Sequence, residues 1–265
     1  MLIKKLLSRV LPSPARTFHI KMHEMTEQLN QAKNEILREL KQAKLPPELE
    51  KSKPKTPFGL GFYSDNYGPD IDINKFANCK LLPNRFMALE YMPKNAVCAE
   101  LGVAYGNFSD KILQTMTPKE LHLIDLYSKT CDEIEWWGMD LLKKSGLNHH
   151  EYILDKFKDY KNVFIKKGYS YKVLAIYPDN YFDYVYVDAG HDYHNVRKDI
   201  DVLINKVKNG GIIAFNDYTF FDLRSTIEYG VLRAVNEFLA EGDHEVVFYC
   251  LQKQKFDDII IRISK

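Results

Sequence analysis

The chain has 265 residues, with 37 basic and 36 acidic side chains, and its formal net charge of +1 provides no general attraction to nucleic acid. Its four isolated cysteines form no C-x-x-C pair, which argues against a disulfide framework or a zinc site and predicts a reducing, cytoplasmic setting. No apolar run reaches the roughly 18 to 20 residues that cross a bilayer, and basic residues interrupt the apolar start of the chain, so we expect no secretory signal.

Residues 1–45 are predicted to form an N-terminal amphipathic helical segment. The first 23 residues carry five basic side chains and no acidic one. From Met25 to Ala43, apolar residues recur at spacings of three or four, which places one apolar stripe on a helix. A second copy of the chain, the rest of the protein or a membrane surface could bury this stripe. We expect homo-oligomerisation first and peripheral membrane contact second.

Residues 46–82 are predicted to be a linker and a loop rich in glycine and tyrosine, because Pro46-Pro47 stops the preceding helix. The main domain is then expected over residues 83–265, beginning with a helix from about Asn84 to Met92. A buried strand follows at Ala96–Ala99, since this run is apolar without polar alternation.

A glycine turn follows that strand, with Glu100, Gly102 and Gly106 in an E-x-G-x-x-x-G pattern. Glycine permits a tight turn and a close approach to a ligand, and Asn107 or Ser109 is expected to cap the next helix. The spacing matches neither the dinucleotide pattern G-x-G-x-x-G nor the phosphate-binding pattern G-x-x-x-x-G-K-[ST].

Further apolar runs alternate with helical segments, as a parallel α/β sheet requires. A helix is expected at Thr226–Ala240, and two closing runs are predicted to form an antiparallel hairpin. The result is a seven-stranded, mostly parallel sheet with an N-terminal helical extension. After Ala96–Ala99, its strands are predicted at Leu121–Ile124, Val163–Ile165, Phe182–Asp188, Gly210–Tyr218, Glu245–Cys250 and Asp258–Ile263.

The glycine turn resembles the first motif of the class I S-adenosylmethionine-dependent methyltransferases, which have a Rossmann-like fold. This resemblance implies that Glu100, Gly102 and Gly106 hold the methionine and ribose parts of S-adenosylmethionine. Asp125 follows Gly106 by nineteen residues and ends the next strand, where it is placed to accept hydrogen bonds from ribose hydroxyls. The stretch ending in Ser170 corresponds to the part of the family that contacts adenine.

The segments YVDAGHDYHNVRKDI and KNGGIIAFNDY resemble a branch of that family, the O-methyltransferases of macrolide sugars and surface glycans. Asp188, His191, Asn216 and Asp217 then lie where ligands bind to an open α/β sheet, with Asp188 also near the cofactor. His191 is the expected general base and Asp188 its catalytic partner. His194 is a weaker candidate.

A magnesium ion could be held by Asp188, Asn216 and Asp217, whose side chains offer hard oxygen ligands. The branch commonly has two aspartates where this chain has Asn216-Asp217, and the lost carboxylate should weaken such a site. Asp199 and Asp201 are expected on the exposed face of a helix. The pair Trp136-Trp137, in a long connection, is expected either to stack on a sugar or to pack that connection onto the domain.

The sequence therefore predicts an S-adenosylmethionine-dependent O-methyltransferase that acts on a hydroxyl of a sugar or surface-glycan precursor. Two alternatives remain open: a methyltransferase of another small polar or phenolic metabolite, and a non-catalytic glycan-assembly scaffold with a methyltransferase fold. The identity of the acceptor does not follow from the sequence.

Overall fold

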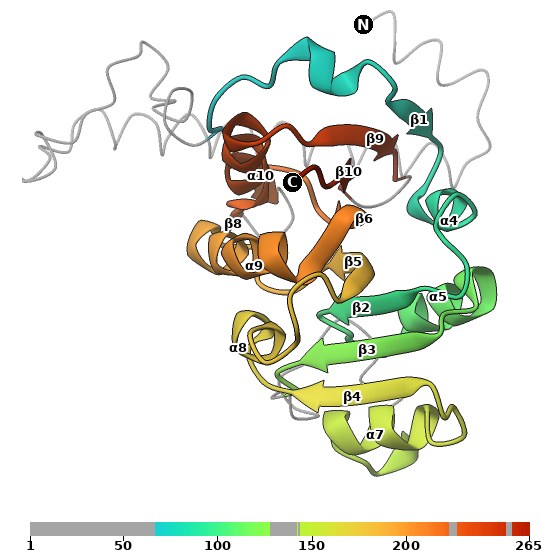
Figure 1. Ribbon diagram of the computed structural model, residues 1–265. Helices are drawn as coiled ribbons and strands as arrows, with labels where there is room; N and C mark the ends of the chain where they lie inside the picture. Colours follow the sequence, from blue (N-terminus) through green and yellow to red (C-terminus); the bar gives the residue numbers. More distant parts are fainter. Residues whose placement is uncertain (1–66, 128–141, 143, 223–226, 253–255) are drawn as a thin grey trace, which may run out of the picture. The chain divides into compact units, whose positions relative to one another are not determined.

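The computed structural model describes residues 67–127, 142, 144–222, 227–252 and 256–265. Eight strands of this part form one sheet in the order β1-β9-β10-β6-β5-β2-β3-β4 (Figure 1). These strands are β1 (Lys80–Leu82), β2 (Val97–Leu101), β3 (Glu120–Asp125), β4 (Val163–Lys167), β5 (Phe182–Val187), β6 (Val207–Phe215), β9 (Glu245–Cys250) and β10 (Asp258–Arg262).

The seven predicted strands are all present, and the closing hairpin is confirmed. Strands β6, β5, β2, β3 and β4 pair in parallel, whereas β10 runs antiparallel to both of its neighbours, β6 and β9. The eighth strand, β1, was not predicted: it pairs in parallel with β9, and it lies in the segment that the sequence assigned to the linker. A three-residue strand carries too short a pattern to be recognised before its partner is known.

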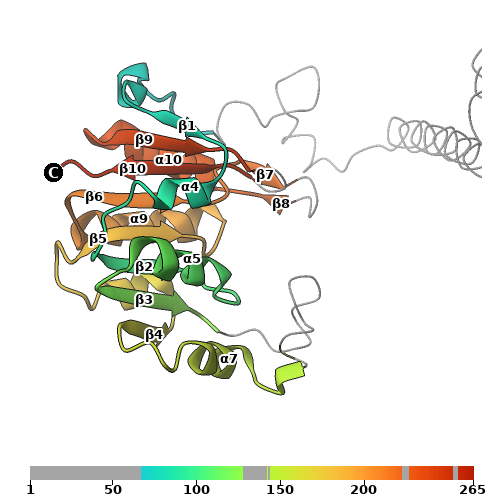
Figure 2. The same cartoon turned by 90° about the vertical axis from the view of Figure 1, so that its right-hand side faces the viewer.

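Helices cover both faces of the sheet (Figure 2). One face is covered by α4 (Arg85–Leu89), α5 (Asn107–Met116) and α7 (His149–Lys156), and the other by α8 (Ser170–Leu174), α9 (Tyr193–Lys206) and α10 (Val231–Glu241). Each face of the sheet has its own hydrophobic core, and alternate residues of β2 belong to one or the other. Val97 and Leu101 pack in the core with α9 and α10, and Cys98 packs in the core with α5. Burial on both faces explains why this strand lacks polar alternation.

Two helix starts differ from the sequence predictions. The N-cap of α5 is Gly106, in a left-handed conformation and without a side-chain cap, because Ser109 turns towards Glu100 instead. The helix α10 begins at Val231, after a short antiparallel pair formed by β7 (Phe221–Asp222) and β8 (Ile227–Glu228). The predicted α4 is confirmed as a shorter helix, capped by Asn84, whose side chain accepts from the Met87 amide.

The N-terminal segment 1–45, most of the linker and the Trp136-Trp137 pair lie outside the described residues, so those predictions stay predictions. Within the described ranges, no helix is both long enough and apolar enough to cross a membrane.

Candidate functional site

The two glycines of the turn are required by the packing of the chain itself. Gly102 has φ +83°, and a Cβ there would lie 1.8 Å from the backbone oxygen of Asp188. Gly106 has φ +69°, and its Cβ would lie 2.6 Å from the ring of Phe157. The sequence interpretation placed a ligand against these glycines, but their nearest neighbours are protein atoms. The end of β2 and the residue after β5 therefore meet directly.

Asp125 holds the glycine turn in place. Its Oδ2 accepts hydrogen bonds from the amides of Val103 at 2.7 Å and Ala104 at 3.3 Å, and its Oδ1 accepts from Tyr127 at 2.9 Å. These bonds explain why an acid is needed at the end of β3. A carboxylate has further acceptor sites, so the predicted contact with ribose hydroxyls is compatible with this arrangement and remains a prediction.

Glu100 is buried beneath the turn and accepts a hydrogen bond from the hydroxyl of Ser109. Burial raises the pKa of Glu100 well above its usual value, and the nearby charges of Asp188 and Asp125 raise it further. The three acids lie at the carboxyl ends of the adjacent strands β2, β5 and β3: Glu100 is the residue before the last in β2, Asp188 follows β5, and Asp125 ends β3. Asp125 and Asp188 are the partly exposed acids of this group, and they fit a ligand that carries positive charge and hydroxyl groups, whereas Glu100 lies beneath them.

Asp188, His191 and Asp217 converge at the same edge, as predicted. The Nε2 atom of His191 lies 3.5 Å from Asp188 Oδ1 and 3.5 Å from Asp217 Oδ2. Their ligand atoms all lie within 4.8 Å of one another, and each side chain is partly exposed. The ring of His191 stacks on Tyr229, with 4.6 Å between ring centroids and 3° between ring planes. An imidazole whose ring is fixed between two carboxylates and a stacked tyrosine could act as a general base, and the same three ligand atoms are also a candidate cation site.

Asn216 contacts this group through its amide nitrogen, while its amide oxygen points away from the group. Its Oδ1 accepts from the guanidinium of Arg85 at 2.5 Å and lies 3.1 Å from the hydroxyl of Tyr186. Its Nδ2 donates to Asp188 Oδ1 at 3.0 Å. The oxygen predicted to bind a metal therefore faces the protein interior, and the converging set is Asp188, His191 and Asp217.

Arg85, Tyr186 and Asp258 form a buried layer under the site that sequence reasoning missed. The Tyr186 hydroxyl contacts Arg85 and lies 3.0 Å from Asp258 Oδ2. Burial raises the pKa of Asp258 to about 8, against the influence of Arg85. Burial alone would lower the pKa of Arg85, but Tyr186 and Asp258 raise it more, so the guanidinium stays charged. No local pattern marks these residues, because Tyr186 lies 101 positions after Arg85 and 72 positions before Asp258.

The other site predictions have mixed outcomes. Ser170 opens α8 and lies beside Asp199, and its predicted contact with adenine is untested. Asp199 was expected on an exposed helix face, which is wrong: it is 1% exposed. Asp201 is exposed as expected and pairs with Arg197. His194 is exposed in the first turn of α9, away from the convergence of the other three side chains.

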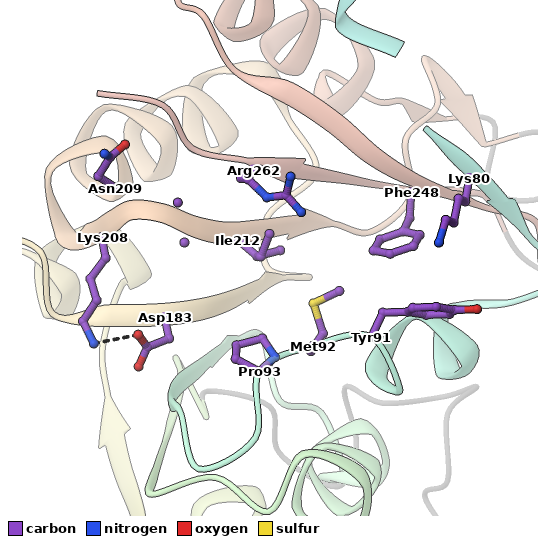
Figure 3. A pocket seen from close by; sticks show the side chains of 12 residues that line it. Lys80, Tyr91, Met92, Pro93, Asp183, Lys208, Asn209, Ile212, Phe248 and Arg262 are labelled. Atoms are coloured by element: carbon purple, nitrogen blue, oxygen red, sulfur yellow. Dashed lines mark hydrogen bonds and ion pairs between the residues drawn. The ribbon is translucent and has the colours of Figure 1, made fainter. Parts of the chain in front are cut away.

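A pocket of about 530 Å³ lies at the other end of the strands, near the residues where β5 and β6 begin. Figure 3 shows Lys208 directed at Asp183 in this pocket, with 2.6 Å between Nζ and Oδ1. Arg262, also in its lining, pairs with Glu245. Ligands of open α/β sheets bind at the carboxyl ends of the strands. We therefore assign the site to the edge that carries Asp188 and His191, and not to this pocket.

Comparison with known proteins identifies the domain. Residues 99–218 match the model of a family described as "Methyltransferase domain". This range contains every residue predicted for the site, but not Arg85 or Asp258. No relative was found among curated protein sequences.

Several solved structures are similar in part. The precorrin-6y C5,15-methyltransferase of Geobacter metallireducens has 17% identity and a TM-score of 0.44, over 68% of this chain and 86% of that one. The N-methyltransferase NodS of Bradyrhizobium japonicum gives the same identity and TM-score, over 68% and 93%. The ribosomal protein L11 methylase of Lactobacillus delbrueckii subsp. bulgaricus has 14% identity and a TM-score of 0.46, over 68% and 77%. Likenesses this weak carry no argument about the substrate.

The strand order, with its single antiparallel strand β10, and the family match agree with each other. Residues 99–218 therefore match a methyltransferase domain, and the enzymatic activity that this match supports is methyl transfer from S-adenosylmethionine.

Proposed function

We propose that the protein methylates a hydroxyl group of a sugar or surface-glycan precursor, such as a precursor of capsule or lipopolysaccharide. The observation that carries this proposal is the position of His191, whose Nε2 lies 3.5 Å from a carboxylate oxygen of Asp188 and 3.5 Å from one of Asp217. A sugar hydroxyl must lose its proton as its oxygen is methylated, and a positioned imidazole is the usual base near neutral pH. The spacing from Asp188 to His191 and the segment around Asp217 resemble the sugar O-methyltransferases.

The carboxyl ends of β2, β3 and β5 fit S-adenosylmethionine. Glu100, Asp125 and Asp188 bring three carboxyl groups to this edge, and the cofactor carries a sulfonium, an ammonium and two ribose hydroxyls. Asp188 contacts Gly102 through its backbone, so the cofactor turn and the base adjoin each other. When bound, S-adenosylmethionine supplies the methyl group in an in-line displacement, for which the protein mainly provides position.

The chain's own part in the reaction follows from the charges around His191. The imidazole takes the proton of the acceptor hydroxyl and becomes positively charged. The carboxylates of Asp188 and Asp217 stabilise this imidazolium, and Tyr229 fixes the plane of the ring by stacking. Contacts that hold the ring in this way reduce the reorganisation needed in the transition state.

A divalent cation is a second way to activate the hydroxyl. Asp188, His191 and Asp217 would hold it, since their ligand atoms lie within 4.8 Å of one another. Such an ion would lower the pKa of a coordinated hydroxyl. We keep magnesium as the candidate because two of the three ligands are carboxylates. Full activity after exhaustive chelation would eliminate a catalytic metal.

Three further parts of the proposal remain to be tested. The acceptor could be another small polar or phenolic metabolite, and the segment 1–45 is proposed to mediate self-association. A cytoplasmic location is proposed from the free thiols of Cys79, Cys98 and Cys250. A scaffold without activity needs no bound cofactor, so calorimetric titration with S-adenosylmethionine separates it from an enzyme.

The decisive experiment presents the purified protein and S-adenosylmethionine to a panel of nucleotide sugars, glycan precursors and phenols, with methylated product detected by mass spectrometry. Replacing His191 with alanine should lower the rate with the accepted substrate by about 10² to 10⁴-fold while cofactor affinity is retained. His194→Ala is the matched control, because His194 is exposed on the next helix and should leave the rate unchanged.

Two results would contradict the proposal. Methylation confined to phenols or amines would exclude a sugar acceptor. Near-normal turnover of His191→Ala would move the role of base to another group, with Asp217 the next candidate.

A further inference from the structure

Arg85 is a buried cation that enters the site from outside the matched methyltransferase region. It is the first residue of the short helix α4 and is 7% exposed. Its guanidinium is packed near the rings of Phe108 and Tyr186, with 5.5 Å and 5.8 Å from Cζ to the ring centroids. Its ion pair with Asp258 is long, at 3.9 Å. Outside this layer, the guanidinium of Arg85 donates to the amide oxygen of Asn216, at 2.5 Å.

Arg85 determines which way the Asn216 amide points. In the observed orientation the amide oxygen accepts from Arg85 and the amide nitrogen donates to Asp188. The reversed amide would set an NH₂ group against the guanidinium, two donors facing each other, and an oxygen against the carboxylate of Asp188, two acceptors facing each other. With Arg85 in place, only one orientation is therefore favourable.

The next contact in the series belongs to the proposed base. Asp188 Oδ1 accepts from Asn216 at 3.0 Å, and the same oxygen lies 3.5 Å from His191 Nε2. Asn216 is 4% exposed, so water does not compete freely for its amide. A continuous series of polar contacts thus leads from Arg85 through Asn216 and Asp188 to His191.

We propose that Arg85 is a positioning residue for methyl transfer: through the Asn216 amide it fixes the carboxylate of Asp188 against His191. This inference rests on the proposed role of His191 as base. It gives a reason for asparagine at position 216. An aspartate there would still accept from Arg85 but would have no hydrogen to donate, and it would repel Asp188 at a distance of about 3 Å.

The test measures the His191 ring directly and then turnover. The full chain is labelled with ¹⁵N and ¹³C at histidine only, and the ring signals are assigned by their loss in His191→Gln. The variants are Arg85→Met, Asn216→Ala and the double substitution. Arg197→Met is the control, because Arg197 also binds two acids, Asp201 and Glu241, but it is a partly exposed residue of α9 outside this series of contacts.

We expect Arg85→Met and Asn216→Ala to shift the same His191 ring signals, and Arg197→Met to leave them unchanged. With the acceptor found in the panel, each of the two variants should lower kcat by about 10- to 100-fold, with the KM for S-adenosylmethionine little changed. The double variant should be no worse than the poorer single variant, because both break the same series of contacts. If Arg85→Met does not fold, Arg85→Ala, which also removes every donor at this position, replaces it in the same cycle.

Unmoved His191 signals in a folded Arg85 variant would overturn the inference, as would losses of kcat that multiply in the double variant. A fall in melting temperature without either effect would show that Arg85 is structural only. The NMR measurement needs no acceptor, so it tests the series of contacts even if no hydroxyl in the panel is methylated. In that case the proposed function fails and the positioning of His191 is judged separately.

Discussion

Asp199 provides a sharp test of the energetics of this fold, because a carboxyl group lies on the apolar face of a helix. The buried residues of α9 are Val196, Asp199, Ile200 and Leu203, at the spacing of one helical face. Asp199 is 1% exposed, and its Oδ1 has no hydrogen-bond partner among the described residues. Burial raises the pKa of Asp199 from 3.8 to about 6, partly countered by Ser170 and the Tyr171 backbone, and Asp192 adds to the rise.

The sign of the effect follows from proton binding. Between about pH 4 and pH 6 the folded carboxyl holds a proton that the unfolded one has lost. The free energy of unfolding therefore falls as the pH rises through this window, and the full penalty is present above it. A shift of about two units, at about 1.4 kcal/mol each, gives a penalty of about 3 kcal/mol at neutral pH.

Replacing Asp199 with asparagine removes the charge and keeps the shape and an acceptor oxygen. We expect the free energy of unfolding to rise by about 1 to 3 kcal/mol at about pH 7.5 and to change little at about pH 4. Urea unfolding followed by circular dichroism at both pH values measures this difference. The control is Asp201→Asn on the same helix, an exposed residue that pairs with Arg197 and should show less than about 1 kcal/mol.

An equal effect of Asp199→Asn at both pH values would refute the reasoning, because the penalty would then not come from ionisation. Destabilisation near neutral pH would show that the carboxylate is held by contacts stronger than the cost of its burial.

Three further outcomes are expected. Gly102→Ala should lower the free energy of unfolding in urea by about 3 kcal/mol or more, because the added Cβ would meet the Asp188 backbone. Gly146→Ala is the control: Gly146 also has a positive φ, but nothing lies within 4 Å of its Cβ position, so the loss should be about 1 kcal/mol. Similar losses in the two variants would contradict this prediction. Asp125→Ala should weaken S-adenosylmethionine binding by about 1 to 3 kcal/mol in calorimetry, with the exposed Asp179→Ala as control, and unchanged affinity would remove Asp125 from the cofactor site. Deleting residues 1–45 should lower the oligomeric mass in light scattering and leave cofactor binding intact, and an unchanged mass would rule out self-association through this segment.

The sequence by itself determined the elements whose patterns are local. Apolar runs such as Phe182–Val187 mark strands buried on both faces, and glycines at positions 102 and 106 mark the turn after β2. The grouping of Asp188, His191 and Asp217 was also predictable, because the carboxyl ends of adjacent parallel strands lie at one edge of a sheet. The burial of Asp199 was available too, since Val196 and Leu203 lie three residues before it and four after it on the same helical face.

Only the tertiary structure decided what depends on contacts between distant parts of the chain. The strand β1 exists because it pairs with β9. In this pairing Lys80 lies opposite Phe248, which is 168 residues later in the chain. The direction of the Asn216 amide is set by Arg85, which lies 131 residues earlier and has no motif of its own. The glycine at position 102 is required by the Asp188 backbone, although the same residue type would equally suit a ligand contact. Sequence periodicity reports which face of an element is buried, whereas the partner of a buried polar group is chosen by packing between elements.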